Sequence, residues 1–127
     1  MKKIINTEYA PQPIGPYSQA ILINNTLYTS GQIALDAKSG ELVLASIEEE
    51  TKKVMDNMFE VLKAAEMNFS NVVKTSIFLS DMGNFQQVNG VYASYFDEAL
   101  APARETVEVA ELPKKVNVEI SMVAVRD

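Results

Sequence analysis

The stretch that decides the fold is Ala101-Pro102-Ala103-Arg104-Glu105-Thr106-Val107-Glu108-Val109-Ala110-Glu111-Leu112-Pro113, followed by residues 116–125. Both parts are rich in β-branched residues, and a short Pro-containing segment separates them. This pattern predicts two β-strands joined by a loop.

Side chains alternate across a strand, which predicts the faces of these two segments. In the first, Val107 and Val109 are expected to face the core, and Arg104 the opposite side. In the second, Val118 is expected to face the core and Glu119 the opposite side. Arg104 and Glu119 would then share one face, either as an exposed ion pair worth about 0 to 1 kcal/mol or as a site that binds a carboxylate and a water.

The composition predicts one globular domain over residues 1–127. The chain is 47% hydrophobic, which is enough for a core, and its net charge is −6. No basic cluster is present, so nucleic acid is not an expected partner. The N-terminal segment turns polar too early for a signal peptide, and no apolar run reaches membrane-spanning length. We therefore expect a cytoplasmic protein that does not bind membranes.

The sequence contains no Cys and no His. A thiolate nucleophile, a disulfide, a Cys/His zinc site and a histidine base are therefore excluded. Acid–base chemistry must use carboxylates, Tyr, Lys, hydroxyl groups or water. No acidic segment has calcium-binding spacing, so we expect no metal.

The rest of the chain predicts a mixed α+β fold. Two strands, residues 18–23 and 27–33, flank an Asn24-Asn25 turn, and a third covers residues 72–79. Ser46 begins a helix over residues 47–66, and a second apolar stripe at helical spacing covers residues 85–99. Two helices cover one face of a sheet, so apolar residues on the other face favour self-association. The residues assigned to that other face are Ile21, Ile23, Ile77, Leu79, Val123 and Val125.

Four further residues allow two interpretations each. Tyr17 follows a proline-rich loop, and it could be an aromatic lid or a phenol directed into a cleft. Ser30 and Gly31 end a strand, where the glycine could mark a bulge or a close approach to a ligand. Asn89 lies at the margin of the second helical stripe, as a solvated residue or an interface group.

Taken together, the motifs closely resemble the reactive intermediate deaminase (Rid) family of imine and enamine deaminases, of the 2-iminobutanoate/2-iminopropanoate deaminase type. The resemblance covers essentially the whole chain in order. Its motifs are Gly15-Pro16-Tyr17-Ser18-Gln19-Ala20, Thr29-Ser30-Gly31-Gln32-Ile33, Val73-Lys74-Thr75 with Phe78, residues 85–92, Pro102-Ala103-Arg104, Val107-Glu108-Val109-Ala110, Leu112-Pro113-Lys114, Val118-Glu119-Ile120 and Ala124-Val125.

This resemblance implies a chorismate-mutase-like fold assembled as a homotrimer, with clefts between neighbouring subunits. It implies that Arg104 binds the substrate carboxylate and that Glu119 positions the hydrolytic water. The other residues implied to line the cleft, some from the adjacent subunit, are Tyr17, Ser30, Gly31, Asn89 and Thr106.

The implied reaction is cofactor-independent hydrolysis of short 2-imino acids and their enamine tautomers, such as 2-aminoacrylate, to 2-keto acids and ammonia. The alternative is a non-catalytic trimer that senses small carboxylate metabolites; a third reading, an RNA-cleaving or translation-inhibiting protein, fits the acidic charge poorly. Glu105, Thr106 and Ser121 depart from many relatives, and Thr106 stands where these have Cys. Substrate range is the property these departures affect.

Overall fold

The computed structural model describes all of residues 1–127. A six-stranded sheet has the order β1-β2-β3-β6-β4-β5. Its strands are β1 (Lys2–Ile5), β2 (Ala20–Ile23), β3 (Thr26–Thr29), β4 (Val72–Leu79), β5 (Ala103–Glu108) and β6 (Val118–Val125). All neighbouring strands are antiparallel except β4 and β5, which are parallel.

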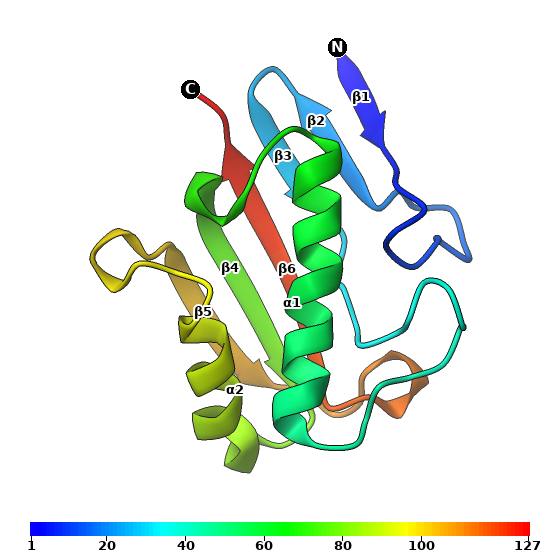
Figure 1. The fold of residues 1–127 in the computed structure, drawn as a ribbon, viewed down its shortest axis with the longest axis vertical. Coiled ribbons are helices and arrows are strands. Elements are labelled where there is room, and N and C mark those ends of the chain that lie inside the picture. The colour runs from blue at the N-terminus through cyan, green and yellow to red at the C-terminus, as the bar shows by residue number, and fades with distance from the viewer.

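Two helices cover one face of this sheet, as the sequence predicts (Figure 1). Helix α1 (Ile47–Ala64) begins at Ser46, whose hydroxyl accepts the N–H of Glu49 at 3.1 Å. Its apolar stripe packs on the central strands β4 and β6 and is wholly buried, for example at Met58. No helix in the structure is both long enough and apolar enough to cross a membrane.

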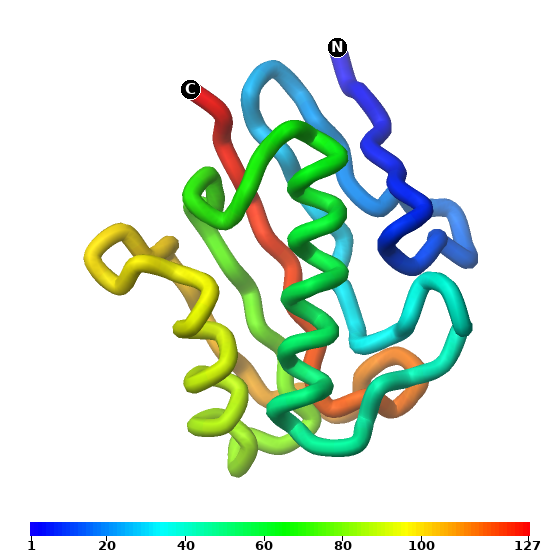
Figure 2. The backbone as a smooth tube through the Cα atoms, viewed as in Figure 1, coloured from blue at the N-terminus to red at the C-terminus, as the bar shows by residue number.

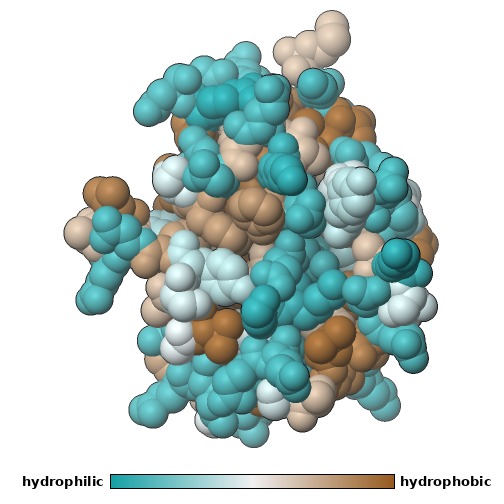
Figure 3. Space-filling model, in the orientation of Figure 1, coloured by the Kyte–Doolittle hydropathy of each residue, from teal (hydrophilic) through white to brown (hydrophobic).

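Helix α2 (Phe85–Ala93) is the crossover between the parallel strands β4 and β5. It is shorter than the predicted 85–99, because the bonds from Tyr95 and Phe96 reach back only three residues. Asp97 then caps a separate 3-10 turn, Glu98–Leu100. The loop between α2 and β5 consequently projects from the body of the protein (Figures 2 and 3).

The strands β2 and β6 each begin two residues later than predicted, and two further strands differ more. The first strand, β1, was not predicted, since Lys2–Ile5 is short and has no clear alternation. The predicted strand 27–33 ends at Thr29, and Asn24 makes the expected hairpin turn with a φ of 52°. Beyond Thr29 only one isolated bridge, between Gln32 and Ile120, continues the pairing.

The face of the sheet away from the helices is uncovered within the chain. Ile21, Val123 and Val125 are only partly buried there, and Ile23 is 40% exposed, as predicted. The assignment of Ile77 and Leu79 to this face was wrong. Both lie beneath the helices with almost no exposed surface, because the register of β4 directs them inward.

Candidate functional site

Arg104 lies at the start of β5 against helix α2. Its Nη1 donates to Oδ1 of Asn89 at 2.7 Å. The guanidinium carbon lies 5.1 Å from the ring centroid of Tyr92 and 5.7 Å from that of Phe85. No carboxylate pairs with Arg104 in this chain, since the three ion pairs involve other residues. The group is therefore an oriented cation that remains able to bind an anion.

Thr106 lies two residues farther along β5, on the same side of the strand as Arg104. Its Oγ1 is buried and has no hydrogen-bond partner. A cavity of about 540 Å³ lies beside Arg104 and Asn89, bounded by Tyr92 and Phe96. We call Arg104, Asn89 and Thr106 the arginine half-site.

Tyr92 lies below the guanidinium of Arg104, and its surroundings favour the neutral phenol. Burial raises the pKa of Tyr92, against the opposing effects of its hydrogen bond to Thr75 and of nearby Arg104. Its hydroxyl donates to Oγ1 of Thr75 at 2.9 Å. The ring thus packs below Arg104 as a fixed, uncharged platform.

Glu119 lies on the uncovered face of the sheet, with its carboxylate against Gly31. A Cβ added at Gly31 would lie 2.2 Å from Oε2 of Glu119. Glu119 has neither an ion-pair partner nor a hydrogen-bond donor in the chain, and burial raises its pKa above the ordinary 4.5. A half-buried carboxyl with a raised pKa is suited to general acid–base chemistry.

Gly31 connects Glu119 to the preceding Ser30 and to Tyr17. Gly31 and Tyr17 line a cavity of about 400 Å³, and Tyr17 is 52% exposed. The hydroxyl of Ser30 donates to the carbonyl of Ser18 at 2.6 Å, so it holds the chain next to Tyr17. We call Glu119, Gly31, Ser30 and Tyr17 the glutamate half-site.

The prediction that Arg104 and Glu119 share one face was wrong. Arg104 pairs with wholly buried Thr75 and faces α2, whereas Glu119 pairs with Phe78 on the uncovered face. The error came from Val107, which was assigned to the core but is 40% exposed. Because β5 is an edge strand, its polar residues pack beside α2 and its valine faces outward.

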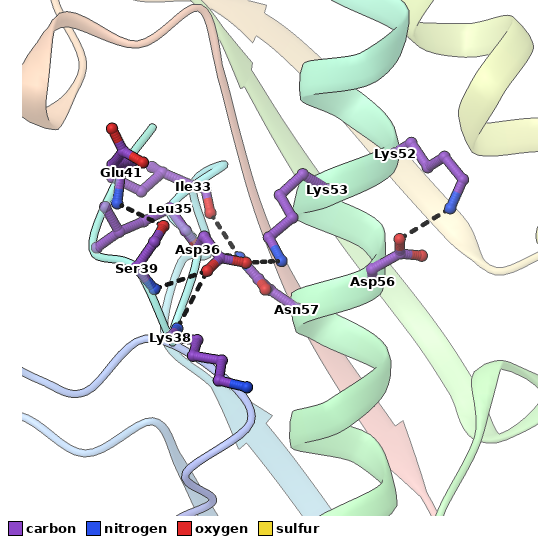
Figure 4. Close-up of polar contacts among 10 residues, drawn as sticks. All are labelled: Ile33, Leu35, Asp36, Lys38, Ser39, Glu41, Lys52, Lys53, Asp56 and Asn57. Atoms are coloured by element: carbon purple, nitrogen blue, oxygen red, sulfur yellow. Dashed lines mark hydrogen bonds and ion pairs between the residues drawn. The ribbon is translucent and has the colours of Figure 1, made fainter. Parts of the chain in front are cut away.

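Helix α1 fixes the segment that follows Gly31 (Figure 4). The Nδ2 of Asn57 donates to the carbonyls of Ile33 and Leu35 at 3.0 and 2.9 Å. One turn earlier, Nζ of Lys53 lies 2.8 Å from Oδ1 of Asp36. The hydrogen bond from Lys53 holds the pKa of Asp36 well below its usual value, with help from Ser39.

The sequence did not single out the aromatic rings below Arg104. Phe85 and Tyr92 were counted only as members of the second apolar stripe, although Tyr92 lies one helical turn from Asn89 on the same helix. That spacing was the available signal. Asn57 gave no such indication, because it differs from a solvated helix residue only through its tertiary contacts.

The architecture and the two half-sites define a class of small α+β proteins with an oriented arginine that has no ion pair and a half-buried glutamate. The family model described as Endoribonuclease L-PSP matches residues 7–126. The chain belongs to this family, also known as YjgF/Rid, so the resemblance noted in the sequence is confirmed.

Individual relatives agree over nearly the full length. The human 2-iminobutanoate/2-iminopropanoate deaminase is 47% identical over 126 residues, which cover 99% of this chain and 91% of the relative. A RutC family protein of Synechocystis is 52% identical over 124 residues, covering 97% and 95%.

Solved structures show the same fold. A putative endoribonuclease from Thermotoga maritima has a TM-score of 0.96 at 44% identity, covering 100% of this chain and 99% of the other. Escherichia coli TdcF with bound serine has a TM-score of 0.92 at 37% identity, covering 98% and 99%.

Proposed function

We propose that this protein hydrolyses short 2-imino acids and their enamine tautomers, such as 2-aminoacrylate and 2-iminobutanoate, to 2-keto acids and ammonia without a cofactor. The observation that carries the proposal is Glu119, a half-buried carboxyl without a partner whose pKa burial raises. The names of several relatives as 2-iminobutanoate/2-iminopropanoate deaminases support the same reaction.

Arg104 is proposed to bind the substrate carboxylate. A guanidinium matches a carboxylate in a bidentate manner, and Asn89 already orients this one. The partnerless Oγ1 of Thr106 offers one further polar contact in the same half-site. Together these groups would hold the imine carbon at a fixed position.

Glu119 is proposed to position the water and to transfer the proton. As the water oxygen bonds to the imine carbon, Glu119 accepts a proton from the water and passes it to the nitrogen. In the resulting carbinolamine the hydroxyl proton moves to the amino group, the C–N bond breaks, ammonia leaves and a C=O bond forms. One water is consumed, and no electrons are exchanged, so the proposed reaction needs no redox partner.

A homotrimer, with clefts between neighbouring subunits, is proposed to bring the two half-sites together. Arg104 and Glu119 leave opposite faces of one sheet, so one chain does not present both to a small acid. In a ring with heterologous contacts, each interface can join the arginine half-site of one copy to the glutamate half-site of the next. The uncovered face, with Tyr28 51% exposed, supports such an assembly.

A coupled assay tests this function. A serine or threonine dehydratase generates the imine in solution, and the rates of imine loss and keto acid formation are followed with wild-type protein, Arg104→Ala and Glu119→Gln. We expect acceleration by the wild type and a loss of about 100-fold or more with either variant. Binding of a 2-keto acid without any acceleration by the wild type would instead indicate a sensor of small carboxylates.

A further inference from the structure

Glu50 is a buried carboxylate that the proposed reaction does not use. It lies in the first turn of α1 and has no exposed surface. None of the three ion pairs in the structure includes it, so no cation offsets its charge. Burial of a lone carboxylate is strongly unfavourable unless hydrogen bonds replace its hydration.

The hydrogen bonds of Glu50 all lead to the start of β6. Its Oε2 accepts the backbone N–H of Asn117 at 2.8 Å and of Val118 at 3.0 Å. Its Oε1 accepts from Nδ2 of Asn117, also at 2.8 Å. The N-terminus of α1 further favours a negative charge at this position. The carboxylate therefore joins the first turn of α1 to the first residue of β6.

The hydrogen bond from Val118 to Glu50 lies where β6 has lost its pairing with β3. The β3–β6 ladder stops at the pair Tyr28 and Val123, because the chain leaves β3 after Thr29. Beyond that point, the N–H groups on this flank of β6 need other acceptors. The N–H of Met122 donates to Oγ1 of Thr29 at 2.9 Å, and the N–H of Ile120 donates to the carbonyl of Gln32 at 3.1 Å. The N–H of Val118 donates to Glu50.

Glu119 lies between the last two of these anchors. On its far side, the bridge to Gln32 also places Gly31 against the Glu119 carboxylate. On its near side, the chain enters from Lys114 and Lys115, whose φ angles of 55° and 56° make an irregular turn. Between this turn and Glu119, β4 and the N–H of Ser80, which donates to the carbonyl of Asn117 at 3.1 Å, hold one flank of the backbone, and Glu50 holds the other.

We propose that Glu50 is a positioning residue for Glu119. By replacing the missing strand carbonyl, it keeps the first residues of β6 in the place where the Glu119 carboxylate rests on Gly31. The inference rests on the proposed role of Glu119 in hydrolysis, and it adds a residue of α1 that does not touch the substrate.

Four variants separate positioning from general stability. Glu50→Leu keeps the volume but removes the acceptors, and Glu50→Asp keeps the charge with a shorter reach. Glu50→Gln keeps one acceptor for both backbone N–H groups, and the Asn117 amide can rotate to accept from the new NH₂ group. The control is Thr51→Val, which removes a buried hydroxyl that bonds only to the carbonyl of Ile47, 2.8 Å away within α1.

We expect Glu50→Leu and Glu50→Asp to lower kcat about tenfold or more, with KM within about twofold, since a displacement of about 1 Å is enough for such a loss. Glu50→Gln and Thr51→Val should retain kcat within about twofold. Faster amide hydrogen exchange at Val118 and Ile120 should accompany only the two impaired variants. If Glu50→Leu does not fold, Glu50→Asp decides the outcome.

A pH profile adds a readout that simple destabilisation does not move. Burial raises the pKa of Glu119, so its displacement into water should shift the acid limb of kcat/KM to lower pH in Glu50→Asp. Wild-type kcat in both Glu50→Leu and Glu50→Asp, with Glu119→Gln inactive, would overturn this inference alone. Wild-type kcat in Glu119→Gln would overturn the proposed function itself.

Discussion

Replacing Gly31 with Ala tests the contact at the centre of the glutamate half-site. The new Cβ would lie 2.2 Å from Oε2, 2.7 Å from Cδ and 2.9 Å from Cγ of Glu119. Real Cβ atoms do not approach other atoms so closely. Gly31 does not have a left-handed φ, so alanine fits its backbone, and only the Glu119 side chain must move.

The two consequences of this movement differ in size. Rotating Glu119 away from its preferred geometry costs about 0.5–1.5 kcal/mol, which corresponds to a fall in Tm of roughly 2 to 8 °C for a chain of this length. Activity should fall much more, by about 100-fold in kcat, because a catalytic group displaced by about 1 Å loses its alignment.

The assay combines thermal unfolding with coupled imine hydrolysis. Gly90→Ala is the matched control, since a Cβ there meets nothing within 4 Å and alanine favours the α2 helix. The double variant Gly31→Ala/Glu119→Gln should be no slower than Glu119→Gln alone, as both changes disable one group. A folded Gly31→Ala protein with wild-type kcat would refute the reasoning.

Three further predictions address the remaining polar groups. Thr106→Val should keep or raise Tm, because the Thr106 hydroxyl has no hydrogen-bond partner in the chain, and a clear loss of Tm would contradict this. If the hydroxyl binds substrate, the same variant should raise KM about tenfold. Glu119→Gln should raise Tm at pH 7 and lose this advantage as the pH falls toward 4. The reason is that the pKa of Glu119 is raised in the folded protein, so the stability of the wild-type protein decreases as the pH rises through that pKa and Glu119 becomes charged. Lys53→Met should lower Tm at pH 7, and the difference in Tm should shrink steadily as the pH falls below 3.8, because the lowered pKa of Asp36 gives a contribution that is present above its ordinary 3.8 and is lost as the pH falls through the lowered pKa. A difference that stays constant as the pH falls below 3.8 would contradict the pairing.

Local patterns predicted the interior of the fold. The strand over residues 72–79 and the helix that begins at Ile47 have strong signals of their own, namely β-branched residues and the Ser46 cap. The short edge strand β1 lacks such a signal, because its pairing with β2 alone defines it. The sequence therefore predicted the elements that carry a local signal and missed β1, which carries none.

The sequence singled out the residues of the two half-sites, whose roles stay a prediction, but it did not predict their geometry. Alternation along β5 shows which residues share a face, but it does not show which of the two faces packs against α2, and no local pattern determines that choice. Glu50 had an available signal, since it lies four residues before Val54 and so continues the buried stripe of α1. Its partners at Asn117 and Val118, however, are 67 and 68 residues away, beyond the reach of any local pattern.

The most direct measurement is subunit complementation between two inactive variants. Arg104→Ala and Glu119→Gln are unfolded together in equal amounts, refolded, and assayed for imine hydrolysis beside each variant treated alone. If each site joins Arg104 of one copy to Glu119 of the next, random assembly leaves about one interface in four intact, so about a quarter of wild-type activity should return. A mixture no more active than its components, with mixed oligomers shown to form, would contradict a site shared between copies.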